Sequence, residues 1–233
     1  MKITTWNIRH GGGSRIKEIS QFCSENRDSD VLVITEFRNN KNKDLIIKVL
    51  DNYGYSRVFT TDAESKINSV LVACKNENKV EVFDELKEHK QRVIKVKNSD
   101  FSIYACYFPQ QKLKKIVFDF LLKEIKNNPN ENIIITGDFN TGKHYLDEKG
   151  ASFYCAEYLN KLEAAGMLDA WRFINKDKRE YSWYSNAGNG FRIDHFYVSN
   201  NLSNYIKDCY YNHQYRENKF SDHSSMTLDL ELK

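Results

Sequence analysis

The chain has 233 residues, of which 40% are hydrophobic and 29% charged, a length and composition typical of one globular domain. Its 35 Lys and Arg against 32 Asp and Glu leave a net charge of +3, which is only weak evidence for a polyanionic partner. The five cysteines have no Cys-x-x-Cys spacing, which argues against a zinc cluster, and no apolar run is long enough for a membrane helix or a signal peptide. We therefore expect a single domain over residues 1–233 that is cytoplasmic and monomeric, with neither a membrane nor an obligate protein partner.

Short runs rich in Val, Ile, Tyr and Phe predict β-strands along the whole chain. In the last run, Met226, Leu228, Leu230 and Leu232 alternate with polar residues, so one face of that strand is apolar. The predicted strands are Ile3–Ile8, Val31–Thr35, Ser69–Cys74, Arg92–Val96, Phe101–Phe108, Ile133–Thr136, Ile193–Val198 and Met226–Leu232.

Apolar residues at helical spacing lie between several of these runs. The predicted helices are Ile16–Cys23 with Ser14 as its cap, Leu45–Leu50, Val117–Ile125, and Tyr154–Ala165 stopped by Gly166. The lysine-rich stretches Lys41–Lys48 and Lys112–Lys123 are interpreted as solvated helix faces. Strands with intervening helices indicate α/β layers. Because the strands are many for one parallel sheet, we predict a four-layer sandwich of two packed mixed β-sheets flanked by helices.

Polar side chains gather just beyond the ends of the apolar runs. Rigid strands deliver such side chains reproducibly to one edge of a sheet. If the ends converge, several carboxylates meet, and they would need a cation or raised pKa values to coexist. A set of oxygen ligands suits Mg²⁺ or Mn²⁺, which could polarise a phosphoryl oxygen. The residues concerned are Asn7, Glu36, Tyr107, Asp138, Asn140, Asp194, Asp222 and His223.

The order of these motifs resembles the endonuclease/exonuclease/phosphatase superfamily over residues 5–223. The segments that carry the resemblance are Trp6-Asn7, Thr35-Glu36, Tyr107-Phe108-Pro109, Gly137-Asp138-Phe139-Asn140, Arg192-Ile193-Asp194 and Ser221-Asp222-His223. The second half resembles the exonuclease III-like branch, which includes abasic-site endonucleases. That part of the resemblance rests on the segments 166–172, 181–183 and 190–194.

The resemblance implies a role for each matching residue. Glu36 would hold the metal with help from Asn7, and Asp138 would orient or deprotonate the attacking water beside Asn140. Tyr107 would contact the phosphate or the leaving oxygen. Asp194 would position His223, which would stabilise charge on the phosphate. Asp222 would lie near a second metal position, and Asp138 is included among the candidate metal ligands.

The first half departs from the exonuclease III-like pattern. Arg9 stands where that branch usually has a small polar or acidic residue, and Gln110 stands where it usually has Asn. Arg9 and His10 could contact a phosphate beside Gly11–Gly13, or they could form a solvated loop. Trp183 could stack on bases or be a core aromatic residue. These three residues and Arg192 are the candidate substrate-binding residues.

Alone, each motif has an ordinary structural explanation. Asp138 could form an Asx turn, Asp194 could pair with Arg192, and His223 could be a satisfied structural histidine. The ordered combination favours an enzyme, a metal-dependent phosphodiesterase acting on DNA as an exonuclease, an abasic-site endonuclease or both. A phosphatase or phosphodiesterase for a small or lipid-derived phosphate is the alternative. An inactive nucleic-acid-binding module ranks last, because Glu36, Asp138 and His223 are all present.

Overall fold

The computed structural model describes residues 1–231, which fold into two six-stranded mixed sheets packed face to face. The first sheet has the order β13-β14-β1-β2-β4-β3. Its strands are β1 (Lys2–Asn7), β2 (Val31–Phe37), β3 (Arg57–Thr60), β4 (Ser69–Cys74), β13 (Ile206–Asn212) and β14 (Ser225–Leu230). The second has the order β5-β6-β7-β8-β12-β9. It comprises β5 (Lys79–Glu81), β6 (Val93–Lys97), β7 (Ser102–Tyr107), β8 (Ile133–Asp138), β9 (Met167–Asp169) and β12 (Asp194–Ser199).

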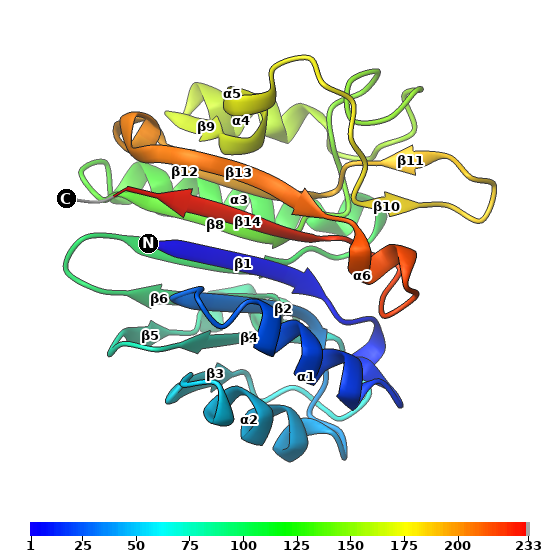
Figure 1. The fold of residues 1–233 in the computed structure, drawn as a ribbon. Coiled ribbons are helices and arrows are strands. Elements are labelled where there is room, and N and C mark those ends of the chain that lie inside the picture. The colour runs from blue at the N-terminus through cyan, green and yellow to red at the C-terminus, as the bar shows by residue number, and fades with distance from the viewer. Residues whose placement is uncertain (232–233) are drawn as a thin grey trace.

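Helices cover the outer faces of both sheets, as Figure 1 shows. The α-helices are α1 (Ile16–Glu25), α2 (Lys43–Asn52), α3 (Lys114–Asn127), α4 (Glu157–Ala164), α5 (Ala170–Asn175) and α6 (Gln214–Glu217). Short 3₁₀ helices are η1 (His10–Gly12), η2 (Asp84–Arg92), η3 (Gln111–Leu113) and η4 (Asn200–Tyr205). A small hairpin of β10 (Trp183–Tyr184) and β11 (Gly190–Phe191) extends from the end toward which β1 points. None of the helices in the described chain could cross a lipid bilayer.

Three apolar clusters hold the four layers together. The first lies between the sheets and joins residues such as Val33 and Val72 to Ile103 and Phe196. The second packs α3 and α4 on the outer face of the second sheet, and the third packs α1 and α2 on the first sheet. Burial of these faces is the main force that assembles the sandwich. The predicted α/β class and layer arrangement are confirmed.

Every predicted strand exists, and no bound differs by more than two residues. The last strand ends at Leu230, and Leu232 lies outside the described residues. Two helix details were wrong. Helix α1 begins after Arg15 and has no side-chain cap, so Ser14 does not cap it. Helix α4 begins only at Glu157, because Cys155 adopts a left-handed backbone with φ of 63° just before it.

Candidate active site

The candidate site lies where strand ends from both sheets meet. Strands β1 and β2 are parallel, so Asn7 and the end of β2 reach the same edge. In the second sheet β7 and β8 are parallel and pair Tyr107 with Asp138, while antiparallel β12 pairs Asp194 with Asp138. The face-to-face packing of the sheets brings these two edges together. Strand topology therefore positions most of the predicted site residues.

Local backbone geometry fixes Asp138 at the end of β8. A Cβ on the preceding Gly137 would lie 1.9 Å from the carbonyl oxygen of Cys106 on β7, so only glycine fits there. One carboxylate oxygen of Asp138 accepts a 2.9 Å hydrogen bond from the backbone N–H of Asn140, which has a left-handed φ of 52°. Asp138 thus forms the Asx turn and also faces the site with its second oxygen.

The side chain of Asn7 connects the two sheets at this point. Its Nδ2 donates to Glu36 Oε1 at 3.3 Å and to Asp138 Oδ2 at 3.0 Å, and it lies 3.5 Å from His223 Nε2. The backbone N–H of Arg9 donates to Asn7 Oδ1 at 2.8 Å and fixes the orientation of the amide. One fully buried amide therefore holds Glu36 and Asp138 close together.

His223 and Asp194 form a buried pair beside Asp138. The ring Nδ1 lies 2.8 Å from Asp194 Oδ2, and Nε2 lies 4.0 Å from Asp138 Oδ2. Burial lowers the pKa of the imidazole, but Asp194 and Asp138 outweigh burial and raise that pKa. Burial also raises the pKa of the Asp138 carboxyl, against the opposing effect of His223. The predicted pairing of Asp194 with His223 is present, and Asp194 makes no ion pair with Arg192 in the described chain.

Glu36 is the next-to-last residue of β2, lies at a register shift and has a left-handed φ of 54°. Its Oε2 accepts from the backbone N–H of His10 at 2.7 Å, and the Tyr107 hydroxyl lies 3.4 Å from Oε1. Burial, and next the charge of Glu36, raise the pKa of the Tyr107 phenol. Tyr107 therefore stays a neutral hydroxyl donor at ordinary pH, and the side chain of Asn68 donates to its oxygen at 3.3 Å.

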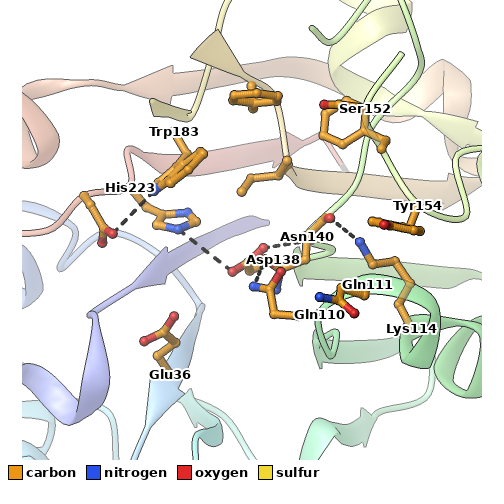
Figure 2. Close-up of a pocket in the computed structure, with 14 residues that line it drawn as sticks. Glu36, Gln110, Gln111, Lys114, Asp138, Asn140, Ser152, Tyr154, Trp183 and His223 are labelled. Atoms are coloured by element: carbon orange, nitrogen blue, oxygen red, sulfur yellow. Dashed lines mark hydrogen bonds and ion pairs between the residues drawn. The ribbon is translucent and has the colours of Figure 1, made fainter. Parts of the chain in front are cut away.

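A cavity of about 350 Å³ opens above these groups. Figure 2 shows Asp138, Asn140 and His223 at its base, with Trp183 close to His223 and Tyr154 at the opposite side. Trp183, Phe191 and Ile193 form an apolar wall, and the indole Nε1 of Trp183 donates to Asp222 at 3.4 Å. Trp183 is therefore half-buried at the cavity and is not an ordinary core residue.

Arg192 does not contact the cavity, so its prediction as a substrate-binding residue was wrong. Its side chain is fully buried, and Nε donates to Asp147 Oδ1 at 2.7 Å. Its Nη1 donates to Asp169 Oδ1 at 3.2 Å, and Arg172 adds a second ion pair to Asp147 at 2.6 Å. These four residues form a closed ionic group, which we call the arginine-bridged cluster. They fix the loop before β12 from behind the site.

Arg9 and His10 lie at the exposed rim of the site, beside Glu36. The His10 Nδ1 lies 3.1 Å from Glu36 Oε2, and the Arg9 Nε lies 3.9 Å from Asp222 Oδ2. The glycines that follow have a packing role, because Gly12 is buried and a Cβ there would lie 2.5 Å from Ile19. The glycine run therefore does not need an anion to explain it.

Oxygen atoms dominate the groups that could hold a metal ion. The ligand atoms of Asp138, Asp194 and His223 lie within 4.8 Å of one another. Asp194 and His223, however, already form a hydrogen bond with each other. Glu36 and Asp138 both contact the same amide nitrogen of Asn7, so a cation could replace that contact. Asp222 is not in the close group and instead faces Trp183 and Arg9.

Sequence reasoning missed several residues of the cavity. Phe191 lies in the short hairpin strand β11, and Tyr154 was assigned to a predicted helix but lies in the loop before α4. Lys114 belongs to a stretch interpreted as solvated, but it is 2% exposed and lines the cavity. The preceding Tyr107-Phe108-Pro109 motif was a usable signal, since it places the following turn next to the site.

Three solved structures are similar to this chain in fold. Over its full length the chain is similar to the structure of a 3′ phosphatase from Neisseria bound to a product DNA hairpin, with 20% identity and a TM-score of 0.86. It is equally similar to a 3′–5′ exonuclease from Neisseria meningitidis. An AP endonuclease from Archaeoglobus fulgidus matches with 21% identity and a TM-score of 0.80. In all three comparisons the match covers 100% of both chains.

At these identities the structural matches establish the fold. No curated protein sequence matches the chain significantly. The model of one protein family, by contrast, matches residues 4–223 and so includes every residue of the site described above. The chain therefore belongs to the Endonuclease/Exonuclease/phosphatase family, a family of metal-dependent phosphoesterases.

Proposed function

We propose that the protein is a divalent-metal-dependent phosphodiesterase acting on DNA, as a 3′–5′ exonuclease, an abasic-site endonuclease or both. The observation that carries the proposal is the convergence of Asn7, Glu36 and Asp138 with the His223–Asp194 pair at the base of one cavity. We call these five residues the cavity floor. This set can position a water molecule, hold a phosphate and stabilise the charge that develops on it.

The donor set fits Mg²⁺ or Mn²⁺. Glu36 and Asp138 offer carboxylate oxygens, the Asn7 amide lies between them, and no cysteine lines the cavity in residues 1–231. Hard oxygen ligands are those that Mg²⁺ and Mn²⁺ prefer. We assign the metal to Glu36, with Asn7 and Asp138 beside it. When bound, it would polarise the phosphoryl oxygen and stabilise the leaving oxygen.

The other steps belong to the side chains. Asp138 is fixed by the Asn140 N–H through one oxygen, and its other oxygen, which also accepts from Asn7, would orient the attacking water and accept its proton. His223 is held by Asp194 and kept protonated, so its Nε2–H donates to a phosphate oxygen. The neutral hydroxyl of Tyr107 is a further donor on the Glu36 side.

Two features favour DNA as the substrate. The apolar wall of Trp183, Phe191 and Ile193 faces the charged floor, and such a wall can pack against a sugar or a base. Arg9 is exposed at the rim and can contact a phosphate. In addition, one of the similar structures was determined with a DNA hairpin.

A phosphatase or phosphodiesterase for a small or lipid-derived phosphate is the second candidate. The cavity of about 350 Å³ favours it, because pockets of this size suit small ligands. Salt dependence separates the two candidates. Binding through several DNA phosphates weakens steeply as salt rises, whereas a single small phosphate responds weakly.

Hydrolysis of end-labelled duplex DNA tests the proposal. The duplexes are blunt, nicked or carry one abasic site, and each is incubated with Mg²⁺, with Mn²⁺ or with a chelator. We expect cleavage that needs the metal and is lost in Asp138→Asn, and the products distinguish attack at ends from attack at abasic sites. Absence of cleavage of every duplex, together with phosphate release from small esters, would overturn the DNA assignment.

A further inference from the structure

Lys114 is a buried cation at the cavity that the mechanism above does not use. It is the first residue of α3 and is 2% exposed. Its ammonium donates to the backbone carbonyl of Asn140, as Figure 2 shows, and the side chain lines the cavity. An ammonium has three N–H donors. Asn140 is the one hydrogen-bond acceptor that it contacts in residues 1–231.

Lys114 also has no counter-ion among the described residues. Within residues 1–231, no carboxylate oxygen lies within 4.0 Å of its Nζ. Lys95 is buried to a similar degree, yet it lies 3.7 Å from Glu81 and 3.6 Å from Glu131. Buried charges in proteins are normally paired. Burial lowers the pKa of Lys114 to about 8, and the opposing effects of Cys155 and Asp138 are smaller.

Lys114 lies close to the start of a helical segment. Helix η3 runs directly into α3, and the backbone N–H of Lys114 already donates to the carbonyl of Lys112 in that turn. The first turn of α3 has no acidic residue, and no side chain caps it. The helix therefore supplies no negative group to pair with the Lys114 ammonium, and an anion in the cavity would neutralise it.

We propose that Lys114, near the start of α3, forms a second phosphate subsite, which takes a backbone phosphate next to the one that is hydrolysed. Lys114 contacts the carbonyl of Asn140, whereas Asp138 accepts from the N–H of the same residue, so the subsite adjoins the hydrolytic centre. The inference deepens the proposed function and rests on it. A substrate with one phosphate leaves Lys114 unpaired, so the subsite selects a strand with consecutive phosphates.

Neutral replacement of single phosphates tests this inference. Duplexes that the protein cleaves are made with an uncharged methylphosphonate at one or the other phosphate flanking the cleaved bond. These are assayed with the unaltered protein, Lys114→Met, Lys114→Arg and the exposed control Lys115→Met. Loss of one charge-assisted contact lowers kcat/KM by roughly tenfold. We expect that loss in the unaltered protein at one flanking position.

The variants should then differ in their sensitivity to the methylphosphonate according to whether residue 114 is charged. The kcat/KM of Lys114→Met should fall roughly tenfold on the unmodified duplex. A methylphosphonate at the sensitive position should lower it no further. Lys114→Arg and Lys115→Met should stay sensitive to the methylphosphonate. If Lys114 only braces Asn140, Lys114→Met will lower kcat on both duplexes alike and will remain sensitive, which overturns the inference.

Two further outcomes are decisive without the methionine variant. If that variant does not fold, the unaltered protein and Lys114→Arg can still be assayed on the methylphosphonate duplexes. If neither protein is slowed by a methylphosphonate at either flanking position, the subsite is overturned. Cleavage of DNA with no such sensitivity removes the subsite alone. If the unaltered protein cleaves small phosphate esters but no DNA, the proposed function fails, and the subsite fails with it.

Discussion

Two groups of buried carboxylates lie near the end of β8, and they differ in how their charge is balanced. In the arginine-bridged cluster, Asp147 and Asp169 meet Arg192 and Arg172, so two acids face two guanidinium groups. On the cavity floor, Asp138 and Asp194 share the imidazole of His223, and Glu36 has only the exposed imidazole of His10 beside it. The first group is satisfied by the protein itself. The second is short of positive charge, as expected of a site that takes a metal ion.

The pKa directions follow the same division. Burial tends to raise the pKa of Asp147, but Arg192 outweighs burial and holds it well below its usual range. The carboxyl of Asp138 is equally buried, and its pKa is raised. A depressed carboxyl pKa marks a pair that stabilises the fold, whereas a raised one marks a group lacking a cation. The difference separates structural from functional carboxylates in one molecule.

The largest expected effect is on turnover. Asp138→Asn removes the carboxylate that orients and deprotonates water while keeping its shape and the Asn140 contact. We expect hydrolysis to fall by roughly 10²- to 10⁴-fold with the urea midpoint of unfolding unchanged or slightly raised. Steady-state kinetics and urea unfolding on the same preparation measure both. Near-normal turnover would remove Asp138 from the mechanism.

Asp194→Asn should be the next largest effect on turnover. The change removes the negative partner of His223 and allows the ring to turn or lose its proton. We expect a fall in kcat of about 10²-fold, with metal affinity nearly unaffected. Kinetics under saturating Mn²⁺ provide the measurement, and a kcat equal to that of the unaltered protein would refute the positioning role.

The arginine-bridged cluster should behave in the opposite way. Arg192→Met leaves Asp147 and Asp169 buried with only Arg172 as a cation, and breaking a buried ion pair costs about 3–5 kcal/mol. We expect the free energy of unfolding in urea to fall by that order. Activity per folded molecule should change far less than in Asp138→Asn. A fully stable but inactive Arg192→Met would restore Arg192 to the substrate-binding group.

Acid should weaken the fold through the same region. Burial, and next the charge of Arg192, lower the pKa of His195 to about 4, so the unfolded chain takes up a proton first as pH falls below about 6.5. His195 therefore contributes a fall in the unfolding free energy between about pH 6.5 and 4, and the raised pKa of Asp138 contributes in the opposite direction. The depressed pKa of Asp147 adds a further loss below about pH 4. The contribution of His195 is the difference in slope between the unaltered protein and His195→Gln in urea unfolding from pH 7 to 4.5, and equal slopes would contradict it.

Much of the fold was predictable because long apolar strands appear as clear apolar runs in the sequence. Strand β13 was missed because its pattern is broken at Lys207 and Asp208, where the register also shifts. Strands β10 and β11 have two residues each, too few for any period to appear. Short or edge strands depend on neighbouring strands for burial, so the local sequence alone does not predict them.

The candidate site was predictable where it depends on strand ends. Asp138 and His223 were found because each follows or precedes an apolar strand. Arg192 and Lys114 were misjudged in opposite directions, because residue type does not tell which side of a layer a long side chain takes. The side-chain directions of Arg192 and Lys114 depend on where the fold places their partners, Asp147 and Asn140.

Metal binding tests the contrast between the two groups most directly. We would titrate Mn²⁺ into the unaltered protein, Glu36→Gln, and the exposed control Glu157→Gln, and follow the heat of binding without substrate. The account predicts saturable binding in the unaltered protein and the control, and an affinity about tenfold or more weaker in Glu36→Gln, because one carboxylate ligand is lost. Equal affinity in all three proteins would show that the cavity floor is not the metal site.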